Sequence, residues 1–549
     1  MPRVREPAPT PGTRAGAQPG TAKTPGLSRH WRLAVITAAG LATVTATTAA
    51  LPAADSASAG AENARAHAAA RVPAQAAAAR AGAGPAQDGD RDEEYWARHA
   101  GNPDQPHTSD TGKPQQGKAE EGKAEDGQGK GGGGGDGRGM DDPGGGEGGD
   151  GRGEGRASGH SDRDEGPAVP VDCDPNALIA AITAANQQGG GRLSLAPHCT
   201  YTLTANDGGN GLPVVVQHMA IDGNGATIAR AANADQFRIF NIGSGGDLKL
   251  RHLTVTRGKT AEDENGGGAY VGPAGRLTLD CVTFDHNTVD DTDNDDGGAI
   301  YNEGVTTIRN TTLSNNSANE GGAVSNDNGK LEITTSRITG NTAANVGGGI
   351  DTDDGTTTIS KSLLKNNYSG SYGGAVDADG GQTEIDDSVL VYNVASSGGG
   401  GAVDTDSSLF IRRSTIAHNT TPRHGGALEL DSPAMVEDSR IYDNTATGAI
   451  GGGGIYTSPG IGDTVSIRRT VISGNQAPGN GASGGGIYTV TSDMTLDLTD
   501  TRITDNTSDD APGGIDNTVG ATVNAYGTNT IVDNVPTNCT GVDTTICFG

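Results

Sequence analysis

The sequence predicts an all-β protein whose main domain is a single-stranded, right-handed parallel β-helix, a type of solenoid. The first observation is a repeat of about 26 residues that recurs from Cys281 to Asn534. The second is that apolar residues alternate within the repeat, as in VSIRRTVIS (465–473), which is typical of strands and not of helices. The third is that Gly and Asn interrupt each unit and turn the chain through corners. Units of this period stack on one another, and we expect about a dozen coils.

The chain begins with a predicted leader and signal peptide over residues 1–59. Basic residues precede an apolar stretch from Leu33 to Leu51, and Ala57 and Ala59 then form a small-residue cleavage pattern. The alternative is an uncleaved membrane anchor, because the stretch is nearly long enough to span a bilayer. Once the signal is cleaved, we expect no membrane span.

Residues 60–167 form a predicted disordered linker. The segment is first rich in Ala and Arg and then in Gly, Asp, Glu and Lys, as in GKAEEGKAEDGQGKGGGGG. Such a composition buries too little apolar surface to fold. We expect a solvated spacer, with a wall-penetrating arm as a possible function.

The folded domain is predicted to span residues 168–549 and to open with a short capping helix. Asp174 is suited to the N-cap and Pro175 to the first helical turn. Leu178, Ile179 and Ile182 would share one face of that helix. The helix would cover the open N-terminal end of the solenoid, as terminal caps do.

The five cysteines favour export. Cys173 and Cys199 flank the start of the folded domain, and Cys539 and Cys547 flank its end, so we predict one disulfide at each end. Cys281 lies within a repeat and is predicted to be a buried free thiol.

An asparagine recurs once in each unit and is predicted to form a structural ladder. Asn tolerates the left-handed conformation of a corner, and stacked Asn side chains can pass amide hydrogen bonds from coil to coil. The apolar residue three positions earlier is predicted to be core, beginning with Phe284 and ending with Ile531. The ladder residues are Asn287, Asn316, Asn341, Asn367, Asn393, Asn419, Asn444, Asn475, Asn506 and Asn534.

Two motifs carry a resemblance to a known family. Phe284-x-x-Asn287 is followed by Gly297-Gly298-Ala299-Ile300, and later units replace the Phe with Ile, Leu or Val. These motifs resemble the repeats of polymorphic outer membrane proteins and of related bacterial right-handed β-helix repeat proteins, over roughly residues 170–549. The resemblance implies the fold but not an activity, because the family includes adhesins and enzymes.

The strand after each Gly pair is the place where polar residues line up by type. In the strand IDTD, Ile350 and Thr352 would point inward and Asp351 and Asp353 outward. Stacking the units gives two outward acidic columns, which together form an acidic ribbon. The carboxylates of the ribbon are Asp351, Asp353, Asp377, Asp379, Asp404, Asp406, Glu429 and Asp431.

These eight carboxylates are candidate calcium ligands. Like charges about 5 Å apart repel by roughly 1 kcal/mol in bulk water, and more at lower dielectric. Bound Ca²⁺, shared protons or solvent screening would each offset that repulsion. Oxygen-only ligands suit Ca²⁺, whereas no His/Cys cluster points to a transition metal.

Catalysis on the same ribbon is the alternative. Parallel β-helix pectate lyases and polygalacturonases carry acidic residues on one outward face, but no catalytic motif of theirs matches here. The paired carboxylates could serve as acid and base, and Arg423 and His424 could supply positive charge beside Glu429. The candidate catalytic residues are Asp351, Asp377, Asp379, Asp404, Asp406 and Arg423.

The formal net charge of −29 argues against nucleic-acid binding. The sequence therefore predicts a secreted or cell-wall-associated, extracellular monomer. It would act as a binding, adhesion or structural module that presents the acidic ribbon to a polysaccharide or a cell-surface component. The alternatives are a polysaccharide lyase or glycoside hydrolase, and a wall-spanning spacer.

Overall fold

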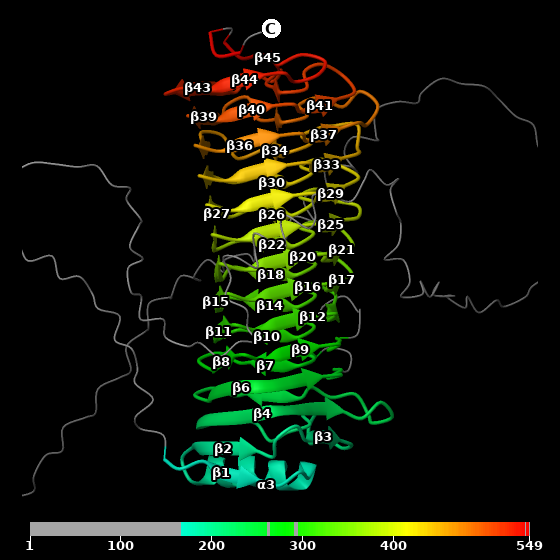
Figure 1. Cartoon of the computed structure of the whole chain (residues 1–549), viewed down its shortest axis with the longest axis vertical. Helices are drawn as coiled ribbons and strands as arrows, with labels where there is room; N and C mark the ends of the chain where they lie inside the picture. Colours follow the sequence, from blue (N-terminus) through cyan, green and yellow to red (C-terminus); the bar gives the residue numbers. More distant parts are fainter. Residues whose placement is uncertain (1–165, 261–263, 290–294, 544, 548–549) are drawn as a thin grey trace, which may run out of the picture. The chain divides into compact units, whose positions relative to one another are not determined.

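The computed structural model describes residues 166–260, 264–289, 295–543 and 545–547. The predicted signal peptide lies outside these residues, as does the predicted linker apart from residues 166 and 167. From residue 169 onward the chain winds into a β-solenoid of about 13 turns (Figure 1). This confirms the predicted fold class and the expected number of coils.

A short helix closes the N-terminal end of the solenoid. Helix α3 (Pro175–Gln187) packs on β1 (Val169–Val171), β2 (Gly191–Leu195) and β3 (Thr200–Leu203) (Figure 1). Asp174 is its N-cap, and the Asp174 side chain accepts a hydrogen bond from the backbone N–H of Asn176 at 3.0 Å. Leu178 and Ile182, on the inner face of this helix, are fully buried. The predicted cap is therefore present.

The strands form three parallel sheets. The first contains β4 (His218–Arg230) and β6 (Asp247–Thr256) and then two strands from each coil. The second sheet has one strand per coil: β5 (Phe240–Ile242), β7 (Ala269–Val271), β10 (Ile300–Asn302), β14 (Val324–Asp327), β18 (Ile350–Asp353), β22 (Val376–Asp379), β26 (Val403–Thr405), β30 (Leu428–Leu430), β34 (Ile455–Thr457), β38 (Ile487–Thr489), β42 (Ile515–Asp516) and β45 (Cys539–Thr540). The third sheet consists of two-residue strands from β13 (Ser317–Ala318) to β41 (Thr507–Ser508).

One central coil shows the repeating unit. It runs through β14, β15 (Lys330–Thr334), β16 (Arg337–Thr339) and β17 (Thr342–Ala343). Strands β15 and β16 both belong to the first sheet, separated by a corner. The coil therefore contains four short strands in three sheets.

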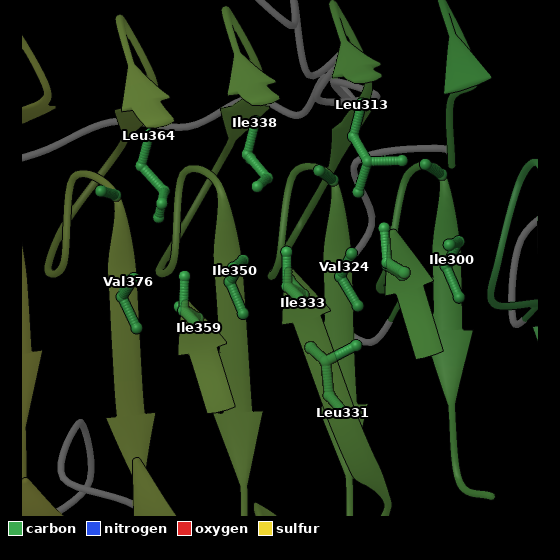
Figure 2. Close-up of a cluster of buried hydrophobic side chains, with 14 of the residues drawn as sticks. Ile300, Leu313, Val324, Leu331, Ile333, Ile338, Ile350, Ile359, Leu364 and Val376 are labelled. Atoms are coloured by element: carbon green, nitrogen blue, oxygen red, sulfur yellow. The ribbon is translucent and has the colours of Figure 1, made fainter. Parts of the chain in front are cut away.

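The core is a stack of aliphatic rows. Ile300, Val324, Ile350 and Val376 lie one above another on the second sheet, and Leu313, Ile338 and Leu364 do so on the first (Figure 2). Their side chains are fully buried. The same holds for the whole predicted core series from Phe284 to Ile531, so that prediction is confirmed. Each coil needs few apolar residues because its neighbours cover both of its open sides.

The asparagine ladder is also confirmed, with one correction. Ladder residues are nearly or fully buried, and from Asn316 onward each Asn Oδ1 accepts hydrogen bonds from the Asn of the coil before. Oδ1 of the first ladder residue, Asn287, accepts from the backbone N–H of Gly258. The last rung passes from Asn534 to Asn538. The left-handed conformation falls one residue earlier than expected, for example at Asn366 and His418. That preceding residue makes the corner, and the Asn after it faces the next coil.

A second ladder had not been predicted from the sequence. A Ser or Thr stands five residues before each ladder Asn from Asn316 to Asn506. In the central coils its Oγ accepts from the backbone N–H of the equivalent residue in the coil before, as Ser388 Oγ does from Ser362 at 3.1 Å. The ladder comprises Thr311, Ser336, Ser362, Ser388, Ser414, Ser439 and Thr470.

The cysteines follow the prediction except in one detail. Cys173 is bonded to Cys199, and Cys539 to Cys547, so each end of the solenoid has a disulfide. Cys281 takes part in neither disulfide, as predicted. It is only half-buried, because it occupies a left-handed corner residue instead of a core position.

Candidate functional site

The predicted acidic columns lie on the outer face of the second sheet. Thr352 is fully buried and faces inward with Ile350, so the residue between them faces out. The first acidic column consists of register partners on four consecutive strands: Asp351, Asp377, Asp404 and Glu429. The second acidic column lies two residues further along each unit: Asp353, Asp379, Asp406 and Asp431.

The two columns differ in exposure, which corrects the picture of one solvated ribbon. The residues of the first column are between 1% and 7% exposed. In the second column Asp353 is exposed and the other three residues are half-buried. The loop before β26 lies against Glu429 of the next strand in this sheet, β30. A Cβ atom on Gly399 in that loop would lie 1.6 Å from Oε2 of Glu429, so a side chain there would displace the carboxylate or the loop.

In three units the residue immediately before the Gly pair interacts with the first column. Nδ1 of His424 approaches Oε2 of Glu429 to 3.2 Å. The Ser483 hydroxyl donates to the Asp516 carboxylate, one coil beyond Tyr488 in the same column. Glu320 interacts electrostatically with Asp351. The sequence analysis had placed His424 beside Glu429, whereas Glu320 and Ser483 were missed, because the residue type at this position changes from unit to unit.

Crowding of buried carboxyl groups raises their pKa values. Burial, followed by the charges of Glu320 and Asp377, holds the pKa of Asp351 well above its usual range. Burial and the neighbouring Glu320 raise the pKa of Asp296 to about 8. Asp353 is exposed overall, but partial desolvation of its carboxyl and the charge of Asp327 raise its pKa to about 6. Protons therefore offset part of the repulsion that the sequence had implied.

The predicted calcium ligands do not converge on one point. Within the residues that the structure describes, no group of three or more His, Cys, Asp or Glu side chains is placed to hold a metal ion. Carboxylates in the columns are spread along the axis, one coil apart. Calcium binding by these residues stays a prediction.

Paired tyrosines stand at both ends of the first column. At the N-terminal end Tyr270 and Tyr301 stack with ring centroids 5.9 Å apart, and the Tyr301 hydroxyl donates to Asp327 at 2.7 Å. At the C-terminal end Tyr456 and Tyr488 stack at 6.0 Å. Stacked tyrosine pairs therefore flank the carboxylates of the first column at both ends.

Arg423 does not lie where the sequence suggested. We had expected Arg423 and His424 to place positive charge beside Glu429, but only His424 contacts that carboxylate. Nη1 of Arg423 instead donates to the hydroxyl of Tyr372 at 3.2 Å. Tyr372, which precedes the Gly pair of an earlier coil, is 6% exposed and had not been singled out.

The fold and its stacked outer columns define a right-handed parallel β-helix protein. Residues 348–536 match the family model for a right-handed β-helix region. Residues 282–303, which contain the Phe284-x-x-Asn287 motif, match the Chlamydia polymorphic membrane protein repeat. The resemblance noted in the sequence is thereby confirmed.

Several solved structures are similar to the chain. The A-module of mannuronan C-5 epimerase AlgE6 from Azotobacter vinelandii is 14% identical, with a TM-score of 0.33, and the match covers 67% of this chain and 94% of that one. Pectate lyase Pel9A is 14% identical with a TM-score of 0.30, covering 69% and 80%. PfbA, a surface adhesin of Streptococcus pneumoniae, is 13% identical with a TM-score of 0.30, covering 65% and 85%. Likenesses this distant do not bear on activity.

No curated protein matches the sequence. Across the described part of the chain, we find no helix of sufficient length and apolar character to span a bilayer. The two disulfides indicate an extracytoplasmic location, because such bonds form and persist in oxidising compartments.

Proposed function

We propose that this protein is a secreted or cell-surface binding module that holds a glycan on the outer face of its second sheet. The observation that carries the proposal is the pair of acidic columns bounded at each end by stacked tyrosines. Carboxylates accept hydrogen bonds from sugar hydroxyls, and a tyrosine ring offers an apolar body with a polar tip. Of the four tyrosines, Tyr270 and Tyr488 are half-buried, whereas Tyr301 and Tyr456 are buried behind them in the stacks. These groups repeat at the coil spacing of about 4.8 Å, which suits an extended polymer.

The more accessible second column is the proposed contact surface. Asp353 is exposed and Asp379 and Asp406 are half-buried, so their carboxylates can meet a ligand without movement of the loops. The buried first column beneath them adds negative charge. A face of this sign disfavours anionic polysaccharides and favours neutral ones, unless cations bridge the two.

A binding experiment tests the proposal. The full chain would be applied to immobilised neutral and anionic polysaccharides, with calcium and with chelator. We expect retention on a neutral polymer, and a loss of affinity of about tenfold or more for the double variant Asp379→Asn/Asp406→Asn, because hydrogen bonds to charged groups are lost. Asp235→Asn, an exposed carboxylate outside the columns, serves as the matched control. Equal binding by all three proteins would contradict the proposal.

A polysaccharide lyase or glycoside hydrolase on the same face is the second candidate. It is favoured by the raised pKa of Asp351 next to Asp377, because glycosidases need one protonated and one ionised carboxyl group. New reducing ends or unsaturated products, abolished in Asp377→Asn/Asp404→Asn, would support it. If the protein binds the polysaccharide but forms no product, the second candidate is contradicted and the binding module remains the proposed function.

A further inference from the structure

A buried histidine–carboxylate pair lies beside the proposed glycan face, and binding alone does not require it. Nδ1 of His424 is 3.2 Å from Oε2 of Glu429, and the two side chains are 6% and 1% exposed. The His424 ring stacks on Tyr456 with centroids 4.0 Å apart. Both the position and the plane of the imidazole are therefore fixed.

The pair has the form of a general base with its positioning residue. A carboxylate that holds Nδ1–H leaves Nε2 as the proton acceptor of the imidazole. Among the described residues, Nδ1 of His424 has no well-aligned hydrogen-bond partner. Its distance of 3.2 Å from Oε2 of Glu429 is nonetheless within hydrogen-bond reach. Such contacts commonly tighten when a substrate binds.

A hydrogen-bond donor pair lies on the other side of the same loop. Nη1 of Arg423 donates to the hydroxyl of Tyr372, and a Cβ atom on Gly398 would meet the Tyr372 ring at 2.6 Å. A Cβ atom on the next residue, Gly399, would lie 2.8 Å from Nδ1 of His424 and closer still to Glu429. Two consecutive glycines thus lie beside the Arg–Tyr pair and the His–Glu pair, and neither places a side chain against them.

We propose that His424, Glu429, Arg423 and Tyr372 form an acid–base site that hydrolyses ester substituents on a neutral glycan. This inference rests on the proposed function for its glycan. A histidine base favours acyl transfer, whereas glycosidases use paired carboxylates. The surrounding carboxylate columns disfavour an anionic sugar.

The reaction consumes one water for each ester. Nε2 of His424 takes a proton from water, whose oxygen bonds to the ester carbonyl carbon. The resulting oxyanion is stabilised by the Arg423 guanidinium and the Tyr372 hydroxyl. The bond between the acyl carbon and the sugar oxygen then breaks, and protonated His424 returns its proton to that leaving oxygen. The products are a carboxylic acid and a free sugar hydroxyl.

The test uses O-acetylated xylan, with deacetylated xylan for the binding arm. The full chain should release acetate, and His424→Gln should lower the rate about a hundredfold or more. Glu429→Gln should lower the rate and shift its pH profile, which a merely structural residue would not do. Tyr372→Phe, which keeps the ring, should also slow release. His418→Gln, another histidine stacked on a tyrosine but outside the site, should not.

The outcomes separate the two proposals. If the wild type binds deacetylated xylan but releases no acetate from the ester, the esterase inference is overturned and glycan binding stands. If acetate release is the same in His424→Gln, the assignment of His424 is overturned. Thermal unfolding of each variant establishes that it is folded. If His424→Gln does not fold, the pH profile of Glu429→Gln still decides the assignment.

Discussion

Asn341 and Asn367 are joined by two hydrogen bonds across neighbouring coils. The backbone N–H and Nδ2 of Asn341 both donate to Oδ1 of Asn367, at 3.1 and 3.0 Å. Nδ2 of Asn367 in turn donates to the carbonyl of Ile338 at 2.9 Å. One buried side chain thus satisfies three groups of the preceding coil, and the arrangement recurs along the solenoid.

Replacing Asn367 by alanine should therefore destabilise the protein strongly. The change leaves three buried polar groups without partners, each worth about 1–3 kcal/mol. We expect a loss of about 3 kcal/mol or more in the free energy of unfolding, measured by urea denaturation. Hydrogen exchange should rise first in the coils on either side, because solenoid stability depends on nearest neighbours.

Asn524→Ala is the matched control for that substitution. Asn524 is half-buried and makes one hydrogen bond, to Asp497 at 2.9 Å. Its loss should amount to about 1 kcal/mol or less. A similar loss in the free energy of unfolding for both variants would show that a ladder Asn stabilises the fold no more than an ordinary half-buried Asn does.

Much of this architecture could be predicted from the sequence, since stacking repeats every feature. The core rows and the ladder Asn recur with the unit, so each copy confirms the others. The Ser/Thr ladder had the same signal five residues earlier, but Ser and Thr are so abundant that it did not stand out. His424 could be placed beside Glu429 because the two residues are close in the sequence. The burial of Asp351 and the contact of Arg423 with Tyr372 depend instead on how loops fold over a face, which the repeat period does not specify.

Stability should fall as the pH rises from about 4 to 8. Asp296, with its pKa raised to about 8, and Asp353, raised to about 6, hold protons in the folded state that the unfolded chain releases near pH 4. The folded protein thus binds more protons in this window, and deprotonation progressively removes that stabilisation. Urea denaturation at several pH values measures the slope.

Asp296→Asn should flatten that slope, because the amide does not titrate. Asp235→Asn, at an exposed position outside the cluster, should leave it unchanged. A slope for Asp296→Asn as steep as that of the wild type would contradict the assignment. The slope that remains in Asp296→Asn should come from Asp353, which is half-titrated near pH 6, and from Asp351, whose pKa is also raised.

Gly399→Ala should disturb the covered His–Glu pair. The added Cβ would lie 1.6 Å from Oε2 of Glu429 and 2.8 Å from Nδ1 of His424, so the loop or the pair must move. Overpacking of this kind destabilises by about 1–3 kcal/mol. Gly191→Ala is the control, since its Cβ would meet only Ala185 at 3.8 Å. Thermal unfolding compares the two, and equal melting temperatures would mean that the loop does not press on the pair.

Removing the N-terminal disulfide should loosen the cap and the first coils before the rest of the solenoid. The bond between Cys173 and Cys199 closes a loop with a sequence separation of 26, whereas the bond between Cys539 and Cys547 spans only 8. Chain entropy therefore predicts the larger effect for the first, about 3 kcal/mol, and a smaller one for the second.

Hydrogen exchange of Cys173→Ser/Cys199→Ser and Cys539→Ser/Cys547→Ser tests this difference. In the first variant exchange should rise in α3 and β1–β3 while the central coils stay protected, because each coil contacts only its neighbours. In the second it should rise around β45. Uniform loss of protection along the whole solenoid would instead mean that the caps and coils unfold as one cooperative unit.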